Sequence, residues 1–326
     1  MCCLSSVRLI LSTDETVPTD SPAATEAKTR FSKDGTAQGV AKQRLIETLA
    51  AADKRVINDP YAAKSVFGAG LIKLIGHRFC VWLGQRLAPG FHEHLIARTR
   101  FIDDLIEKTA GEGVEQYVIL GAGYDMRGHR LQLPPSLKIF EVDQLEVQTR
   151  KRAKLNGDSA YRENVIYVPV DFSYQSLTES LVAAGFEQDK STVFTLEGVS
   201  QYITKDAVRS TLQELSPLTQ NVHSTFFLSY VDRLLNDDPK ACFGRGYPNA
   251  EKRAKRIKDL SAKVGEPWIS FYSAEEMQNL LAEGGYSVRQ DITIDDLNTL
   301  YFSPVGRALP ENELFRLEHF VVATKP

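Results

Sequence analysis

Hydrophobic positions follow a helical period in the first third of the chain. From residue 36 to about residue 108, large apolar side chains return at helix-like spacing, as at Val40, Leu45 and Leu49. Pro60 interrupts this pattern, because the residue before a proline disfavours the α region. Nothing in this stretch resembles a strand, so these residues predict a group of helices ahead of the main domain.

The pattern changes after residue 110. Short β-rich runs alternate with amphipathic segments, which is typical of a parallel sheet covered by helices on both faces. The last two runs are joined without an obvious helix, which indicates an antiparallel pair. The fold class is therefore α/β, with a Rossmann-like sheet that is mostly parallel and has its last strand antiparallel. Seven strands are predicted, at residues 117–120, 138–142, 165–170, 192–196, 224–230, 287–293 and 319–323.

The chain divides into three parts on this basis. Residues 12–30 are rich in Ser, Thr, Pro and Ala, a composition too poor in large apolar side chains to order itself. Residues 231–272 are too long for a simple connection and are predicted to be an insertion. Its basic helix is either a solvated face or a contact for an acidic acceptor. The predicted parts are a disordered leader (1–30), a helical cap (31–110) and a Rossmann-like domain (111–326).

Charge and composition narrow the function. The formal net charge is −3, so no overall positive field favours DNA or RNA. No apolar run reaches the roughly 20 residues of a membrane helix. None of the 4 cysteines forms a CxxC pair, which speaks against a zinc knuckle or a redox motif. We expect a cytoplasmic protein without nucleic-acid, membrane or metal partners. Acylation of Cys2 and Cys3 stays an open alternative.

The sharpest chemical signal is a strand that runs into a Gly-x-Gly bend. Gly121 and Gly123 follow the apolar run Tyr-Val-Ile-Leu and allow a ligand to approach the backbone closely. Alone, this pattern is equally typical of a structural turn. Met126 stands where a dinucleotide-binding motif has its third glycine, which speaks against NAD or FAD. An adenosyl ligand without phosphates fits better, and S-adenosylmethionine is such a ligand.

Acidic residues follow the next three strands. Asp143 is placed to accept hydrogen bonds from ribose hydroxyls, or to cap the helix that follows it. Asp171 and Phe172 are placed to contact adenine, although a solvated turn explains Asp171 equally well. Glu197 follows the fourth strand, where the methionine end of the cofactor and the acceptor should meet. Ligands of open α/β sheets bind at the carboxyl ends of the strands.

Basic and aromatic residues complete the predicted site. Arg98 or Arg100 would pair with the carboxylate of the cofactor, unless each only pairs with a neighbouring aspartate. Tyr202 and Tyr230 are candidates for the acceptor pocket, with core packing as the alternative. The sequence does not identify the acceptor or the oligomeric state.

Together these residues resemble the leucine carboxyl methyltransferase family, and most closely its broad microbial branch of S-adenosylmethionine-dependent methyltransferases. The resemblance covers about residues 36–200, and the last third is similar only in its strand pattern. It implies a class I methyltransferase fold with seven strands. It also implies that Arg98 binds the cofactor carboxylate, Gly121 the methionine part, Asp143 the ribose, Asp171 and Phe172 the adenine and Glu197 the cofactor amine, with Lys42 or Arg44 as a basic lid residue. The matching segments are residues 36–41, 59–61, 97–100, 120–127, 140–143 and 196–197.

The predicted activity is methyl transfer from S-adenosylmethionine to a carboxylate, or a hydroxyl, of a small molecule or a peptide C-terminus. A carboxylate is ionised at neutral pH and needs no general base, whereas a hydroxyl needs one. Two rivals stay open, an NAD(P)-dependent oxidoreductase and a non-catalytic cofactor-binding module. His92 and His94 lie two positions apart and point different ways on a helix, so no metal site is predicted there. The candidate bases are His92, His94, His129 and His223.

Overall fold

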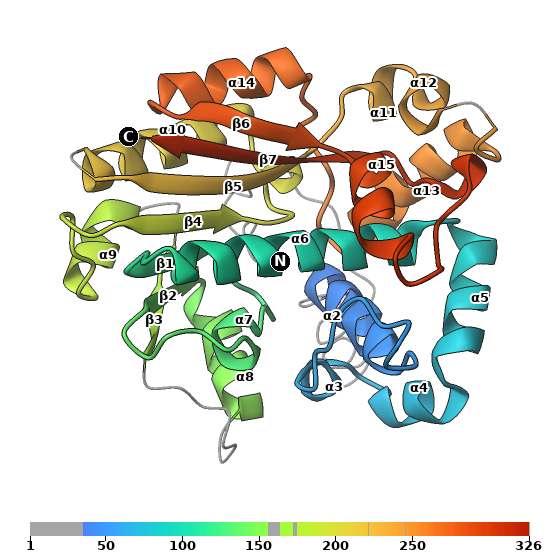
Figure 1. The fold of residues 1–326 in the computed structure, drawn as a ribbon. Coiled ribbons are helices and arrows are strands. Elements are labelled where there is room, and N and C mark those ends of the chain that lie inside the picture. The colour runs from blue at the N-terminus through green and yellow to red at the C-terminus, as the bar shows by residue number, and fades with distance from the viewer. Residues whose placement is uncertain (1–34, 156–163, 172–174, 221, 245, 326) are drawn as a thin grey trace, which may run out of the picture.

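The computed structural model describes residues 35–155, 164–171, 175–220, 222–244 and 246–325. Seven strands form one sheet in the order β3-β2-β1-β4-β5-β7-β6 (Figure 1). The first five strands are parallel, and β7 is antiparallel to both of its neighbours, which confirms the predicted sheet. The strands are β1 Gln116–Leu120, β2 Lys138–Asp143, β3 Val165–Pro169, β4 Thr192–Leu196, β5 Ser224–Val231, β6 Ser287–Ile292 and β7 Glu318–Lys325.

The central strands are buried on both faces. Every residue of β1, β4 and β5 is buried, as expected of parallel strands covered by helices. Successive side chains point to opposite faces, so each strand contributes to two separate cores. Val118 and Phe194 belong to one core, and Ile119 and Val193 to the other.

Helices precede β1, as the periodicity predicted. α6 is the longest and runs along the sheet, while α2 to α5 gather beyond the end toward which the β4 arrow points (Figure 1). We call α2 to α5 the cap helices. Gly90 starts α6 with φ +74°, and a Cβ there would lie 1.8 Å from the Glu313 carbonyl oxygen, so only glycine fits. These helices are α2 Gly35–Thr48, α3 Ala62–Ser65, α4 Ala69–Ile75, α5 His77–Leu87 and α6 Phe91–Gly111.

The remaining helices connect or follow the strands. α13 is the basic helix predicted within residues 231–272, whereas α14 was not predicted, although Ser273 and Glu276 form a capping box at its start. Among the described helices, none has both the length and the apolar composition needed to span a bilayer. They are α7 Arg127–Arg130, α8 Leu145–Leu155, α9 Leu177–Ala183, α10 Lys205–Leu215, α11 Leu234–Asp237, α12 Pro239–Phe243, α13 Ala250–Lys263, α14 Ala274–Glu283 and α15 Ile294–Leu297, with short 3₁₀ or π turns η1 Ser200–Tyr202, η2 Ser216–Thr219, η3 Asn298–Phe302 and η4 Glu311–Glu313.

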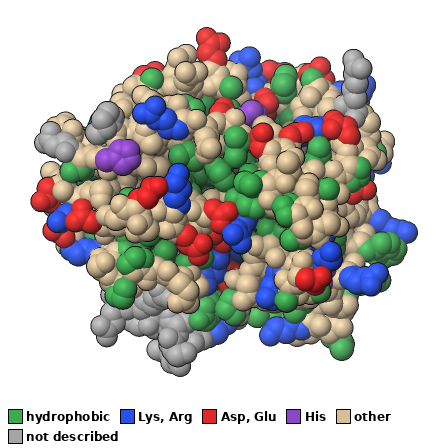
Figure 2. All heavy atoms as spheres, viewed as in Figure 1, with side chains coloured by type: hydrophobic (Ala, Val, Ile, Leu, Met, Phe, Trp, Pro, Cys, Tyr) green, Lys and Arg blue, Asp and Glu red, His purple; other side chains and the backbone are tan. Residues whose placement is uncertain are grey.

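The predicted leader over residues 1–30 lies outside the described residues. Charged side chains of both signs are interspersed over the face shown in Figure 2. This distribution agrees with the small net charge of the whole chain, and it offers no single basic surface on that face for a nucleic acid.

Candidate active site

A cavity of about 790 Å³ lies where the carboxyl ends of β1 and β4 face the cap helices and α13. The loops after β1 and β4 line one end, and α2, α4, α5 and α13 line much of the remainder. Open α/β sheets bind ligands at this position, because the strand order reverses between β1 and β4. The volume is toward the upper end of the range for small-molecule sites, so a cofactor and an acceptor fit together.

The bend after β1 requires both of its glycines. Gly121 has φ +69°, and a Cβ there would lie 2.8 Å from Val199 Cγ2. Gly123 has φ +45°, and its N–H donates to Asp143 Oδ2 at 2.6 Å. The other oxygen of Asp143 accepts the N–H of Gln144 at 2.7 Å. The structure thus brings Gly121, Gly123 and Asp143 together, with Asp143 buried behind the loop and outside the cavity lining.

Arg98 reaches the cavity from α6 and is held by two carboxylates. Its Nε donates to Glu197 Oε1 at 2.9 Å, and its Nη1 donates to the two oxygens of Glu318 at 3.0 and 2.8 Å. Within the described part of the chain, no residue accepts a hydrogen bond from Nη2. This nitrogen is therefore the donor that Arg98 can offer to a bound carboxylate. Glu318, on β7, was not predicted as a site residue.

Arg127 joins the same network from the other side of Glu197. It donates to Glu197 at 2.6 Å, to Asp125 at 2.5 Å and to Asp103 at 2.8 Å. Arg130 also donates to Asp103, at 2.5 Å. The whole network consists of the guanidinium groups of Arg98, Arg127 and Arg130 and the carboxylates of Asp103, Asp125, Glu197 and Glu318.

Carboxylates outnumber guanidinium groups in this network. Burial alone would raise the pKa of Glu197, but Arg127 and Arg98 outweigh it and hold that pKa below its usual value. Burial also acts to raise the pKa of Glu318, but Arg98 and His94 bring it down to about 2. Both groups are ionised at neutral pH, so this end of the cavity favours a cationic ligand.

His94 lies one helical turn before Arg98 and also lines the cavity. Its Nε2 is 2.9 Å from Glu318 Oε2. An ionised carboxylate only accepts, so Nε2 is the nitrogen that carries the hydrogen. Its Nδ1 is buried and has no hydrogen-bond partner among the residues that the structure describes. The structure thereby separates His94 from His129 and His223, which do not line the cavity.

The structure places Asp171 away from the cavity lining. It follows β3 and is half-buried, and its N–H donates to Gln175 Oε1 at 2.7 Å. Phe172 lies outside the described residues. The adenine contacts expected of Asp171 and Phe172 therefore stay predictions.

The two acceptor-pocket candidates lie in different places. Tyr202 lines the cavity and packs edge-on against Trp268, with ring centroids 6.5 Å apart. Tyr230 is fully buried in the sheet, where its hydroxyl donates to Asp291 at 2.9 Å, and it does not line the cavity. The structure places Tyr230 away from the cavity, because its ring packs into the core against Tyr272 and His319.

The structure also distinguishes between the basic residues that were alternatives for the same roles. Arg100 lies nearer the surface and pairs with an aspartate of its own helix at 2.8 Å, so Arg98 is the arginine that reaches the cavity. Lys42 and Arg44 both line the cavity, but the Arg44 Nε is bound to Asp59 at 2.8 Å. Lys42 is the more available cation of the two.

Comparison with known proteins decides the family. The model of the leucine carboxyl methyltransferase family matches residues 37–216, more than half of the chain. A Mycobacterium tuberculosis protein named "Putative S-adenosyl-L-methionine-dependent methyltransferase" is 32% identical over 85% of this chain and 89% of its own length. The Bacillus subtilis relative YktD, named in the same way, is 31% identical over 71% of this chain and 72% of its own length.

The chain belongs to the leucine carboxyl methyltransferase family. It is an S-adenosyl-L-methionine-dependent methyltransferase. The two alternative functions, an NAD(P)-dependent oxidoreductase and a non-catalytic cofactor-binding module, are therefore excluded. The solved structure of a DUF574 family protein from Streptomyces avermitilis shares its fold, with a TM-score of 0.54 and 15% identity over 87% of this chain and 97% of that one.

The site of this methyltransferase fits its cofactor on three observations. The Gly121 bend has no room for a Cβ, the Nη2 of Arg98 is available for a carboxylate, and the surplus of carboxylates suits a sulfonium. When bound, S-adenosyl-L-methionine supplies an activated methyl group, and the residues of the chain supply its position.

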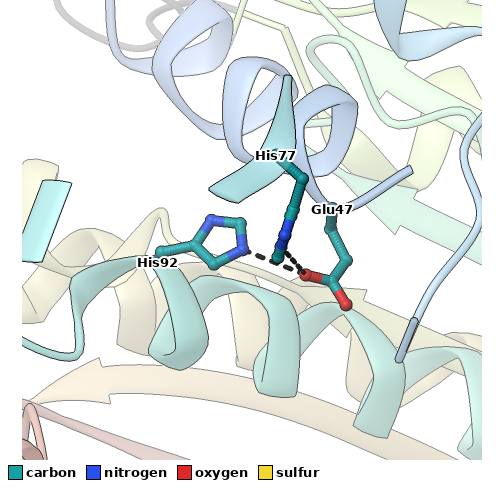
Figure 3. A group of neighbouring side chains, drawn as sticks. All are labelled: Glu47, His77 and His92. Carbon is teal, nitrogen blue, oxygen red and sulfur yellow. Dashed lines mark hydrogen bonds and ion pairs between the residues drawn. The ribbon is translucent and has the colours of Figure 1, made fainter. Parts of the chain in front are cut away.

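A second polar cluster links the cap helices of this methyltransferase to α6 (Figure 3). Glu47 of α2 is fully buried, with Oε2 3.0 Å from His92 Nε2 and 3.5 Å from His77 Nε2. These three groups are a set that metal ions favour. However, Arg307 already binds both oxygens of Glu47, at 2.6 and 3.1 Å, and compensates its charge. We interpret the cluster as an anchor for the cap helices.

Proposed function

We propose that this methyltransferase transfers the methyl group of S-adenosyl-L-methionine to an oxygen of a carboxylate, or of a hydroxyl, on a small molecule or a peptide C-terminus. One observation carries the proposal. A single cavity is lined by the glycine bend, by the Arg98–Glu197 pair and by Tyr202 and Trp268. Cofactor and acceptor can therefore meet within one cavity. We further expect the enzyme to act in the cytoplasm.

The residues divide the work of binding. In the proposal, the Arg98 Nη2 binds the cofactor carboxylate, and Glu197 lies beside the cofactor amine. The amides of the Gly121–Gly123 bend approach the ligand closely, and Asp143 holds that bend in place beneath the proposed ribose site. Asp171 and Phe172 are assigned to the adenine.

The chemistry demands alignment more than proton transfer. The acceptor oxygen displaces the methyl group from the sulfonium, with oxygen, carbon and sulfur in line. A carboxylate acceptor has a pKa of about 4, so it is already a nucleophile at neutral pH. The protein then needs to hold the two partners close and dry, and well-oriented reactants gain large factors in rate from this alone.

The test is to incubate the enzyme with methyl-labelled cofactor and a metabolite extract, and to identify the labelled product. A methyl ester loses labelled methanol in mild base, whereas an ether keeps its label. We expect base-labile label. Label that survives base supports a hydroxyl acceptor, and label bound to nitrogen or carbon contradicts the proposal.

A hydroxyl acceptor is the second candidate, and it would need a general base, for which His94 is a candidate that lines the cavity. The Glu318 carboxylate fixes the orientation of the His94 ring through Nε2, at 2.9 Å. If the acceptor is a hydroxyl and His94 is its base, His94→Gln should lower kcat by a factor of roughly 10²–10⁴. If the acceptor is a carboxylate, kcat of the variant should stay within a few-fold and remain flat above pH 6. Measurement of kcat for both enzymes from pH 5 to pH 9 distinguishes the two classes of acceptor.

A further inference from the structure

The outer wall of the cavity is made of large apolar side chains that water reaches. They come from α4, α5 and α13, and they are between 41% and 61% exposed. Apolar side chains also appear in Figure 2 at the right-hand edge, where α4 and α5 lie in Figure 1. Soluble monomers rarely expose large contiguous apolar areas unless a ligand or a partner covers them. The wall consists of Leu71, Ile75, Phe79, Leu83, Leu87 and Leu260.

The inner wall of the cavity contains the polar side chains of Gln201 and Trp268, beside Tyr202. Gln201 is 5% exposed and lines the cavity, and its Oε1 has no hydrogen-bond partner among the described residues. The same holds for the Nε1–H of Trp268, which also lines the cavity. A polar segment in a largely apolar lining suits the head group of an amphiphilic ligand. Gln201 and Trp268 belong to segments that meet beside Tyr202, since the Ile269 N–H donates to the Gln201 carbonyl at 2.8 Å.

Two cations in the lining have no carboxylate close by, although Asp125, Glu197, Glu266 and Glu318 also line the cavity. Lys42 and Arg256 line the cavity, and no carboxylate in the described part of the chain lies within ion-pair distance of either. Cations of this kind attract an anion toward the cavity.

We infer that the methyl acceptor is an amphiphilic monocarboxylic acid whose aliphatic body lies along α4, α5 and α13. This inference rests on the proposed function and names its substrate class. In this proposal Lys42 and Arg256 attract the carboxylate end, and the aliphatic chain covers the exposed leucines. A second copy of the protein is a poorer occupant, because the apolar side chains turn into a cavity that is continuous with the glycine bend.

The inference predicts how the Kd of a homologous series of acids depends on chain length. Each additional CH₂ buried against an apolar wall should tighten binding about fourfold. Hexanoate, octanoate, decanoate and dodecanoate should therefore show a log-linear fall of Kd with chain length. A polyether acid, 2-[2-(2-methoxyethoxy)ethoxy]acetate, has the length of decanoate without its apolar surface and should bind at least tenfold more weakly.

Tryptophan fluorescence measures this binding without any turnover. The chain has 2 tryptophans, and Trp82 lies on α5 outside the cavity lining, so Trp82→Phe leaves Trp268 as the reporter. The titrations are made on the full chain with S-adenosylhomocysteine present. A flat series, or equal binding of the polyether acid, overturns the inference.

A matched pair of variants locates the chain of the acid. Leu83→Asp places a charge on the wall, and Leu234→Asp places one on a side chain of similar exposure, 42% against 47%, outside the cavity. We expect Leu83→Asp to weaken dodecanoate binding at least tenfold with unchanged S-adenosylhomocysteine binding, and Leu234→Asp to change neither. If Leu83→Asp instead turns a dimer into a monomer with dodecanoate binding unchanged, a second copy covers the wall and the inference is wrong.

Methyl-transfer assays then test the proposed O-methylation and the apolar acceptor separately. Label that moves to decanoate in preference to the polyether acid supports both. Transfer to short or polar acids alone overturns the apolar acceptor and leaves O-methylation intact. Tight, length-dependent binding of acids with no transfer to any of them overturns the proposed function, and leaves the apolar wall as a binding site.

Discussion

Asp143 supports the cofactor site from behind the Gly121–Gly123 bend. It accepts the N–H of Gly123, and the carboxylate thereby fixes the bend that a ligand must approach. Hydrogen bonds to a charged group contribute about 1.5–3 kcal/mol, more than neutral ones. A loss of charge at this position should therefore be felt by the cofactor, even though Asp143 lies behind the loop.

Asp143→Asn tests this at constant size. We expect S-adenosylhomocysteine to bind roughly 10–100-fold more weakly, which corresponds to about 1–3 kcal/mol. Isothermal titration calorimetry measures it, with Asp189→Asn at the surface as the control. An unchanged Kd in a folded variant would remove Asp143 from the cofactor site.

Residues close in sequence were predictable, and partners far apart were not. Gly121, Gly123 and Asp143 follow strands in a known order, so a local pattern was enough to bring them together. Glu318 lies 220 positions from Arg98, and its pairing depends on where β7 enters the sheet. No local signal in the sequence carries that information, and the same holds for the His94–Glu318 contact.

At the scale of elements, His319 joins three strands near the end of β5. Its ring lies between Asp291 of β6 at 2.8 Å and Asp232 after β5 at 3.3 Å, and it stacks on Tyr230. Burial acts to lower the pKa of His319, but the two aspartates outweigh it and raise that pKa to about 9. The protonated form is therefore the one that the fold stabilises.

The raised pKa of His319 makes the stability of the fold depend on pH. A raised histidine pKa contributes stability that is complete below the unfolded pKa of about 6.5 and is lost as pH rises through about 9. The loss should reach at most about 3 kcal/mol. Urea unfolding at pH 6 and pH 9.5 measures it, and His319→Gln should reduce the difference between the two. An equal difference in the variant would assign the effect to other groups.

Glu47 anchors α2 through contacts with α5, α6 and the segment that follows η3. Removal of one partner from a buried ion pair costs about 3–5 kcal/mol, so Glu47→Gln should lower the free energy of unfolding by roughly this amount. Urea unfolding followed by circular dichroism measures the change. Zinc should not stabilise the wild type, because Arg307 already occupies the carboxylate, and a metal-dependent rise in Tm would contradict this interpretation.

The elements themselves were predicted more readily than their order in the sheet. Periodicity located all seven strands, since buried strands and helices leave distinct patterns. It did not show that β7 lies between β5 and β6, because strand order depends on packing and not on local propensity. The missed α14 had a readable signal in Ser273 and Glu276, which the capping-box pattern would have revealed.

At the scale of the whole molecule, ligand binding and folding are linked. A ligand that binds only the folded state adds about 2.7 kcal/mol at one hundred times its Kd. S-adenosylhomocysteine at that concentration should raise Tm by several degrees, whereas NADH should not. Differential scanning fluorimetry tests both, and stabilisation by NADH alone would contradict the assignment of the cofactor.

The position of β7 has a consequence for how the enzyme folds during its synthesis. β7 is synthesised after every other strand, yet it lies inside the sheet and provides the Glu318 carboxylate that pairs with Arg98. A nascent chain that is still short of residue 318 has an open gap beside β5 and an arginine without its main counter-ion. The ability to capture cofactor should therefore switch on late in translation, when this strand leaves the ribosome.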